Sequence, residues 1–104
     1  MILIKGIRFR RIEAIALWPF VLVKSQNPSQ RTLRHEKIHL RQQLEMLILP
    51  FYLWYVFEWM YKWWKLGDAD KAYYDICFER EAYKNEDEPH YLNLRKFWNF
   101  TKYL

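Results

Sequence analysis

The first quarter of the chain has the pattern of β-strands. Residues 2–4, 7–12 and 14–23 are rich in β-branched and aromatic residues, and such runs between turn residues are typical of strands. Gly6 separates the first two runs and predicts a turn. Pro19 interrupts the last run, and because it has no N–H to donate, it predicts an edge strand or a bulge there. We therefore expect a small N-terminal sheet.

A helix is expected over residues 28–49. Asn27 is a good N-cap, and Pro28 suits a first helical turn, where the missing N–H costs nothing. Pro50 is expected to end the helix or kink it. One stripe of leucines repeats at helical spacing and predicts the face turned to the core: Leu33, Leu40, Leu44 and Leu47.

Three further helical segments follow. Residues 51–64 are dominated by aromatic side chains, and residues 68–85 begin with an aspartate that suits an N-cap. Residues 86–89 form an acidic break, and residues 92–103 are expected to form a short closing helix. Strands followed by helices indicate an α+β fold, and the length indicates a single domain over residues 1–104.

Composition narrows the class of protein. Hydrophobic residues make up 52% of the chain and aromatic residues 20%, which excludes a disordered chain and suggests that some rings meet lipid or a partner. The net charge of +5 would suit nucleic acid or an anionic membrane. However, the basic residues are scattered apart from one cluster at Arg8, Arg10 and Arg11, and no nucleic-acid signature is present. We expect no nucleic-acid partner.

The location of the protein is predicted from its cysteine content and its apolar runs. Cys77 is the single cysteine, so an internal disulfide is excluded and a reducing, cytoplasmic location is expected. The N-terminus lacks the pattern of a signal peptide. The apolar run at residues 46–57 is too short to span a bilayer, which takes about 20 residues. A buried or partner-facing helix is expected, and peripheral membrane contact through residues 51–64 is the alternative, because Trp and Tyr favour the interface.

The motif His35-Glu36-Lys37-Ile38-His39 is the strongest chemical signal in the chain. Histidines four residues apart lie on one face of a helix, about one turn from each other. Both imidazoles can then reach one tetrahedral zinc ion. Glu36 is rotated around the helix, so it can hold the water in the fourth position and take its proton. Two surface histidines with no metal are the alternative.

Zinc needs a third protein ligand. Glu45 follows the motif, but without an intervening glycine the helix continues and this side chain points away. A later helix offers Glu79, in an otherwise apolar stripe where a carboxylate is costly unless its charge is compensated. Zinc would compensate it, and so would a salt bridge, for instance to Arg95. We favour Glu79 as the ligand, with Glu81 on another face as the reserve.

These two motifs resemble those of the gluzincins, zinc peptidases with two helical histidines and a glutamate from a later helix. More narrowly, the chain is similar to the minigluzincins, which resemble the catalytic domains of membrane metallopeptidases of the CAAX-protease and heat-shock-protease type. The family's second motif is a glutamate, then a small residue, then an aspartate four positions after the glutamate. Here these positions hold Glu79, Ala82 and Tyr83. The resemblance covers roughly the whole domain.

The resemblance implies an α+β metallopeptidase whose substrate is a peptide or a protein and whose cofactor is zinc. Tyr83 stands where the family has an aspartate, which would orient a zinc-binding histidine and so affect affinity and turnover. Arg34, Gln42 and Asp75 are the residues that could replace it. The resemblance also implies that residues 15–23 hold a peptide by edge pairing, as the family's upper-rim strand does.

The reaction also needs a donor for the developing oxyanion. The polar residues that follow the ligand helix are His90, Tyr91 and Arg95, and we place His90 first. Their alternative role is at the surface or in helix capping.

Two other functions fit the same sequence. The substitution at Tyr83 and the small size would suit a zinc-binding but inactive domain that recognises a peptide or a protein. The aromatic segment 51–64 and the positive charge would suit a membrane-surface or interaction protein whose histidines are incidental.

Overall fold

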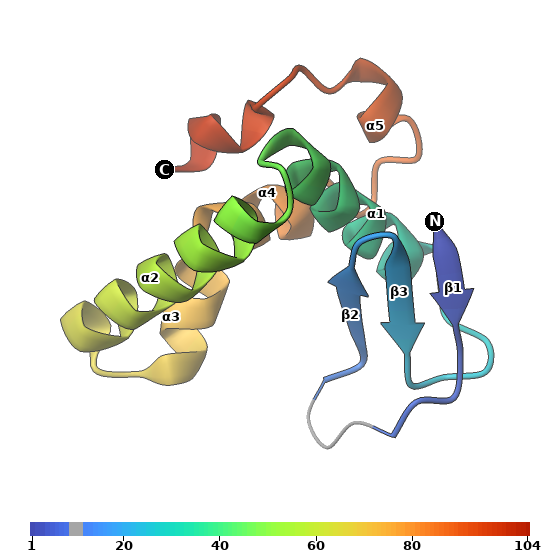
Figure 1. Ribbon diagram of the computed structural model, residues 1–104, viewed down its shortest axis with the longest axis horizontal. Helices are drawn as coiled ribbons and strands as arrows, with labels where there is room; N and C mark the ends of the chain where they lie inside the picture. The colour runs from blue at the N-terminus through green and yellow to red at the C-terminus, as the bar shows by residue number, and fades with distance from the viewer. Residues whose placement is uncertain (9–11) are drawn as a thin grey trace.

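The computed structural model describes residues 1–8 and 12–104 and has the expected α+β fold. Residues 9–11, which belong to one predicted strand and to the arginine cluster, lie outside the described residues. A three-stranded sheet packs on one side of the first helix, and the other helices lie on its far side (Figure 1). The elements are β1 (Ile2–Ile4), β2 (Ala14–Leu17), β3 (Phe20–Val23), α1 (Gln30–Glu45), α2 (Leu49–Leu66), α3 (Ala69–Asp75), α4 (Cys77–Asn85), α5 (Tyr91–Leu94) and the 3₁₀ helix η1 (Asn99–Tyr103).

The sheet has the strand order β1-β3-β2, so β3 is central and β2 is an edge strand. β1 pairs with β3 in parallel, and β2 pairs with β3 as an antiparallel hairpin. Residues 14–23 are therefore two strands, and the expectation of a single interrupted strand was wrong. Pro19 lies in the turn between them, after a cis peptide bond to Trp18. Gly6 has a φ of 75°, as expected for a turn, and a Cβ there would lie 2.4 Å from the Gln26 side chain.

Helix α1 is shorter than predicted. It begins after Ser29, whose hydroxyl accepts a hydrogen bond from the Thr32 N–H, so Ser29 rather than Asn27 is the N-cap. The helix ends at Glu45, and the chain reverses through two residues with positive φ, Leu47 and Ile48. Pro50 therefore lies in the first turn of α2 instead of ending α1, a position where proline is tolerated.

The buried face of α1 is not the predicted leucine stripe. Leu40 is buried, but Leu44 and Leu47 are exposed. The buried side chains of α1 are instead largely polar: His35, Glu36, Ile38, His39, Leu40, Gln42 and Gln43. Buried polar side chains need hydrogen-bond partners. Helix α1 lies between the sheet and α4, and both supply such partners.

The helix predicted over residues 68–85 is broken into two. Its start is as expected, since Asp68 accepts hydrogen bonds from two backbone N–H groups at the start of α3. The chain becomes extended at Ile76, which is fully buried, and α4 then begins. Side chains of α2 satisfy the interrupted backbone: Glu58 accepts from the Cys77 N–H at 2.9 Å, and Lys62 donates to the Asp75 carbonyl at 2.9 Å.

The C-terminal segment is also interrupted. Residues 92–103 were expected to form one helix, but α5 ends at Leu94, and Arg95 has extended backbone. This break lets the Arg95 side chain reach two glutamates in the interior, as described below. The chain then returns along α4 as η1 and contributes Phe100 to the core.

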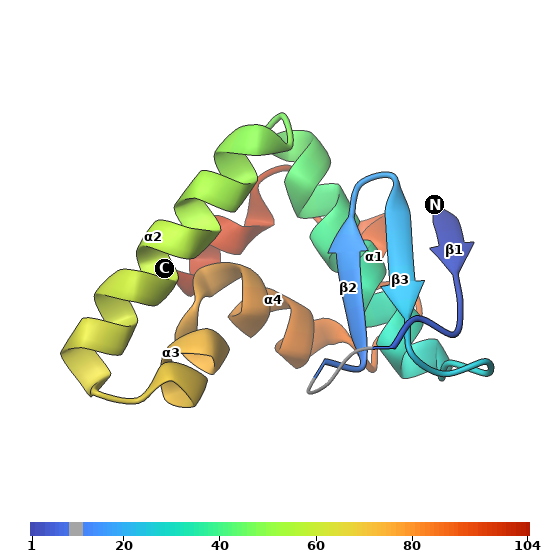
Figure 2. The same cartoon turned by 60° about the horizontal axis from the view of Figure 1, so that its bottom comes forward.

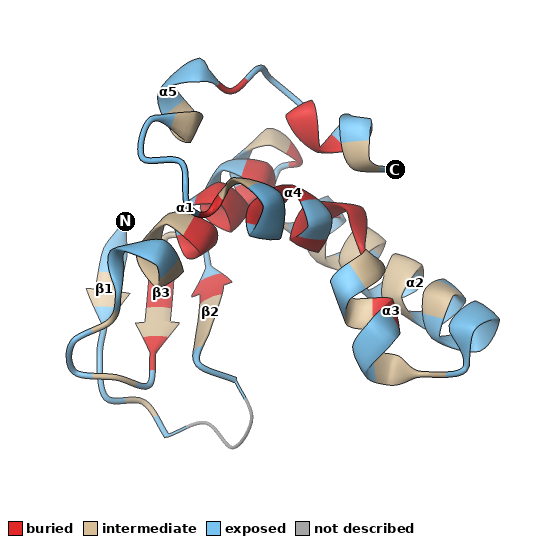
Figure 3. Cartoon of the chain, turned by 180° about the vertical axis from the view of Figure 1, so that it is seen from behind, coloured by how far each residue is buried: buried red, intermediate tan, exposed pale blue. Residues whose placement is uncertain are grey.

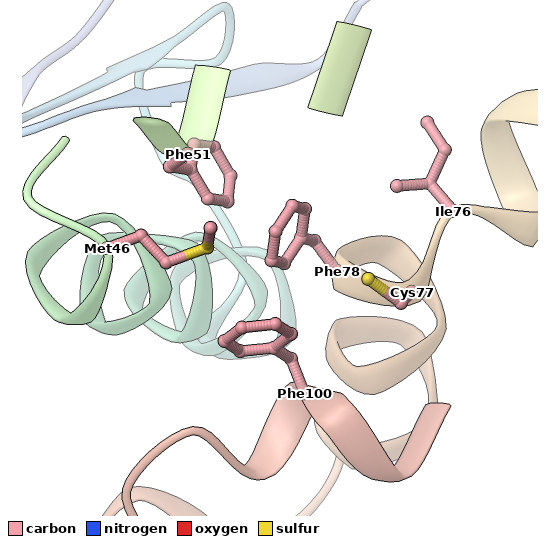
Figure 4. Packing of buried hydrophobic residues seen from close by; sticks show 6 residues of the cluster. All are labelled: Met46, Phe51, Ile76, Cys77, Phe78 and Phe100. Carbon is pink, nitrogen blue, oxygen red and sulfur yellow. The ribbon is translucent and has the colours of Figure 1, made fainter. Parts of the chain in front are cut away.

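Two hydrophobic clusters hold the elements together. The larger one joins the start of α2, the start of α4 and η1 around Phe78 (Figure 4): Met46, Phe51, Ile76, Cys77, Phe78 and Phe100. The smaller one lies between the sheet and α1: Ala16, Val21, Val23 and Leu40. Buried residues concentrate where α1 meets α4, whereas α2 and α3 are mostly intermediate or exposed (Figure 3). Among the described residues, no helix is both long and apolar enough to cross a membrane.

Candidate metal centre

The two motif histidines lie side by side in the interface of α1 with α4. Their spacing of four residues places both on the buried face of the helix, with exposed fractions of 6% for His35 and 5% for His39. The imidazole ring centroids are 4.8 Å apart. Glu79, in the first turn of α4, is 4% exposed and faces both rings. The structure therefore brings together the three residues proposed as ligands.

The three ligand atoms form a nearly equilateral triangle. The distances are 3.2 Å between the two Nε2 atoms, 3.2 Å from His35 Nε2 to Glu79 Oε1, and 3.1 Å from His39 Nε2 to the same oxygen. Ligands about 2.0–2.1 Å from a tetrahedral zinc ion are separated by roughly 3.3 Å. Two nitrogens and a carboxylate oxygen at this spacing fit zinc in both chemistry and geometry.

The outer nitrogen of each imidazole is held by a different acceptor. The Nδ1–H of His35 donates to Glu86 Oε2 at 2.7 Å, and the Nδ1–H of His39 donates to Gln42 Oε1 at 2.8 Å. A carboxylate oxygen can only accept, and so can the amide oxygen of glutamine. Both partners therefore require the proton on Nδ1. The two Nε2 atoms are then the ones that face Glu79, where a bound metal ion would replace the proton between them and the carboxylate.

The orientation of the Gln42 amide is itself fixed. Its Nε2 donates to the Phe78 carbonyl at 3.1 Å and to Glu81 Oε1 at 2.8 Å, and neither group can donate in return. A flipped amide would face two acceptors with its oxygen. Gln42 was one of three residues considered as substitutes for the family aspartate, and it is the one that contacts a histidine of the motif. Arg34 instead donates to the Glu86 carbonyl, and Asp75 pairs with Lys62.

The electrostatics of the site are those of a buried anion facing imidazoles. Burial favours the neutral form of Glu79, but His39 and His35 outweigh it and hold the pKa of this carboxyl well below its usual range. Burial likewise opposes the charge on His39, yet Glu79 raises the pKa of this imidazole to about 9. The Tyr55 hydroxyl donates to Glu79 Oε2 at 2.7 Å. The other carboxylate oxygen, Oε1, is the one that faces the two imidazole nitrogens.

Glu36 is buried beside this triangle and is not part of it. Its exposed fraction is 7%, and burial raises the pKa of its carboxyl, an effect that His39 and His35 partly offset. No hydrogen bond from a described residue reaches this carboxylate. In the described residues, every side-chain oxygen that is fully shielded from solvent has a hydrogen-bond partner. The Glu36 oxygens have no such partner, so they are in contact with solvent. Such a carboxylate can receive a proton from a nearby water.

Glu81, the reserve ligand, lies in a separate cluster. It accepts hydrogen bonds from Arg95 and Tyr91, and Arg95 also pairs with Glu45. The salt bridge to Arg95 that was weighed for Glu79 is therefore made by Glu81. Both Tyr91 and Arg95, two of the three residues considered as oxyanion donors, are engaged in this cluster.

His90, the first choice as oxyanion donor, is exposed and precedes α5. Its role stays a prediction. Tyr83, at the family's aspartate position, packs edge-to-face with His35, with ring centroids 4.4 Å apart, and its hydroxyl pairs with the Tyr73 hydroxyl.

Two residues of the site were missed in the sequence. Glu86 is the first residue of the acidic break, and its position seven residues after Glu79, two helical turns along the same face, was a usable signal. Tyr55 gave no signal, because a tyrosine among many aromatic residues looks like part of the core.

Searches against family models, curated proteins and solved structures found no match to this chain.

Proposed function

We propose that this chain is a minimal zinc-dependent metallopeptidase-like domain that hydrolyses peptide bonds, as its resemblance to the minigluzincins suggests. The observation that carries the proposal is the triangle of His35 Nε2, His39 Nε2 and Glu79 Oε1, with sides of 3.1–3.2 Å. Its spacing matches three ligands of one tetrahedral ion. A solvent-touching glutamate next to the first histidine adds the base that hydrolysis requires.

His35, His39 and Glu79 would hold the ion. Zinc in such a site polarises the scissile carbonyl and lowers the pKa of a bound water. Glu36 takes the proton of the attacking water and delivers it to the leaving amine. The predicted donor His90 is the candidate for stabilising the oxyanion.

The sheet offers a place for the peptide. β2 is the edge strand beside α1 (Figure 2), and an edge strand can pair with an extended peptide. The Gln43 side chain covers one end of this edge, since its amide bonds the Ala16 carbonyl at 2.8 Å and the Trp18 N–H at 2.8 Å. A bound peptide would therefore pair along the other end, at Ala14.

The test compares the wild type with Glu36→Gln in zinc content and in cleavage of unstructured casein. We expect about one zinc per chain in both proteins, and activity lower by roughly 10²–10⁴-fold in the variant, the usual effect of losing a general base. Casein cleavage that persists in the presence of a zinc chelator would contradict the proposal.

The chief alternative is an inactive zinc-binding domain that recognises a peptide or a protein, and the observation in its favour is Tyr83 at the aspartate position. Zinc in both proteins with no cleavage by either would support it. A wild type that binds no zinc would remove both functions and favour an interaction protein whose histidines are incidental.

A further inference from the structure

Helix α2 has two apolar faces, and only one of them is covered. The inner face packs on the core and on α3 through residues such as Phe51, Tyr55 and Trp59. The two charged residues of this face are also engaged, since Glu58 and Lys62 bond each other and the α3–α4 junction. The helix lies along the outside of the molecule with its opposite face turned away from the other elements (Figures 1 and 2).

The outer face is a continuous apolar stripe. Six residues at helical spacing form it: Leu49, Leu53, Val56, Phe57, Met60 and Trp64. Their exposed fractions run from 47% to 81%, which leaves roughly 700 Å² open to water if a large side chain presents about 150–250 Å². The largest apolar patch of a typical monomer is about 300–600 Å². A helix that is apolar all round is normally buried, so this face is expected to meet a partner.

The order of residues along the stripe suggests what that partner is. The N-terminal half is aliphatic, with Leu49 and Leu53, whereas the C-terminal half carries Phe57 and Trp64. Two copies of α2 packed antiparallel about a two-fold axis at residues 56–57 would place each aliphatic half against an aromatic half. Leu49 would then face Trp64 of the other copy, and large residues would meet smaller ones throughout, the complementarity that an isologous interface requires.

We propose that the outer face of α2 binds a second copy of this chain, forming an antiparallel helix pair. The open area matches the requirement, because a stable interface buries about 800 Å² on each partner, with 600 Å² at the low end. The stripe has the composition of an interface core, in which aromatic residues and methionine are enriched and charges are rare. The single exposed charge of the helix, Lys65, lies at its end, where a polar rim is expected.

Charge argues against an anionic bilayer as the occupant. A membrane-surface helix normally has several free basic residues flanking its apolar face. Here Lys62 is held by Glu58 and Asp75, and the helix is followed by two aspartates, Asp68 and Asp70. The proposal concerns a surface distinct from the metal centre and does not depend on the proposed activity.

The first experiment measures the mass of the 104-residue chain in solution by sedimentation equilibrium at micromolar concentration. We expect a dimer for the wild type and a monomer for Phe57→Lys. The matched control is Phe97→Lys, because Phe97 is 76% exposed but lies after α5, and this variant is expected to remain a dimer. A monomeric wild type, or a dimer that survives Phe57→Lys, would overturn the proposal.

A second experiment fixes the orientation. Cys77 is buried, so mild oxidation should not crosslink the wild type. Val56→Cys places a thiol next to the two-fold axis and should form a disulfide-linked dimer. Leu49→Cys should not, because the antiparallel arrangement places Leu49 opposite Trp64 of the other copy. Crosslinking of both variants would indicate that the two helices are parallel and would contradict the proposed antiparallel pair. Flotation with phosphatidylserine vesicles adds the competing outcome: a monomer whose vesicle binding is lost in Phe57→Lys would assign the surface to a bilayer.

Discussion

Two glutamates on α4, Glu79 and Glu81, are similarly buried but belong to different kinds of site. Glu79 is 4% exposed and Glu81 is fully buried. Glu79 faces two imidazoles, and Glu81 faces the guanidinium of Arg95. In both cases burial alone would raise the pKa of the carboxyl, and the facing groups lower it instead.

The difference lies in what compensates the negative charge. Arg95 carries a permanent charge and, together with Tyr91, fills the hydrogen-bonding sites around Glu81. The charge of this carboxylate is therefore balanced without any further group. The imidazoles facing Glu79 are charged only when protonated. Their outer nitrogens are already held by acceptors, so a proton or a metal ion at the centre must balance the carboxylate. Both glutamates are buried, so burial alone does not distinguish a structural carboxylate from a candidate metal ligand. The type of group that each carboxylate faces does distinguish them.

The largest expected effect is on folding stability, from Glu81→Ala. This substitution leaves the buried Arg95 with one carboxylate partner instead of two, and removing one member of a buried ion pair typically costs about 3–5 kcal/mol. Urea unfolding of the zinc-free protein measures the loss. The control is Glu88→Ala, at an exposed position of the acidic break, which should change the free energy of unfolding by less than about 0.5 kcal/mol. A similar small change in Glu81→Ala would show that the arginine cluster is not structural.

The converse variant, Glu79→Gln, should lose zinc and keep its fold. The amide removes the anionic ligand while preserving shape, so we expect zinc content to fall from about one per chain to near zero after desalting. Wild-type protein should gain about 2.7 kcal/mol of stability at a zinc concentration one hundred times the Kd, and the variant should gain none. Glu81→Gln is the matched comparison. Zinc lost in Glu81→Gln and kept in Glu79→Gln would reverse the assignment of the two sites.

These contrasts show how far the sequence could predict the molecule. The α+β fold was predictable, because the strand-type and helix-type patterns occupy separate parts of the chain. The pairing of Glu79 with the motif was predictable from the cost of a carboxylate in an apolar stripe. Helix bounds were not, because tertiary contacts decided them. Glu58 and Lys62 satisfy the break at Ile76, and the extended backbone at Arg95 serves an ion pair with residues far away in the chain.

The orienting partners of the histidines were the least predictable part of the site. Gln42 is on the same helix as His39, three residues on, so its contact follows from helical spacing. Glu86 is the C-cap of α4 and keeps helical backbone, so its spacing of seven residues from Glu79 places it on the same face. That spacing does not say that His35 lies opposite, because this depends on how α1 packs against α4.

Gln42 joins the two glutamate sites, and replacing it should affect both moderately. Gln42→Leu preserves the approximate volume but removes the acceptor for His39 Nδ1 and a donor to Glu81. Loss of such an orienting group typically weakens metal affinity 10–100-fold. Competition with a zinc chelator measures this change. Gln43→Leu, the adjacent glutamine that bonds β2 instead, is the control and should leave zinc affinity within a few-fold. Equal losses in the two variants would mean a general loss of packing instead of a lost orientation.

Tyr55→Phe should give the smallest effect, and it should affect only the cluster around Glu79 and not the cluster around Glu81. The Tyr55 hydroxyl donates to Glu79 Oε2, the oxygen that does not face the histidines. The bond is present in the metal-free protein, so only the difference in its strength between the free and the zinc-bound states changes zinc affinity, and this difference should not exceed about 1 kcal/mol. That corresponds to a change in zinc affinity of at most roughly fivefold. Tyr73→Phe, which loses a bond only to Tyr83, should leave zinc affinity unchanged. A loss above a hundredfold in Tyr55→Phe would mean that the phenol is itself a ligand. The ion would then be held by four protein groups instead of three.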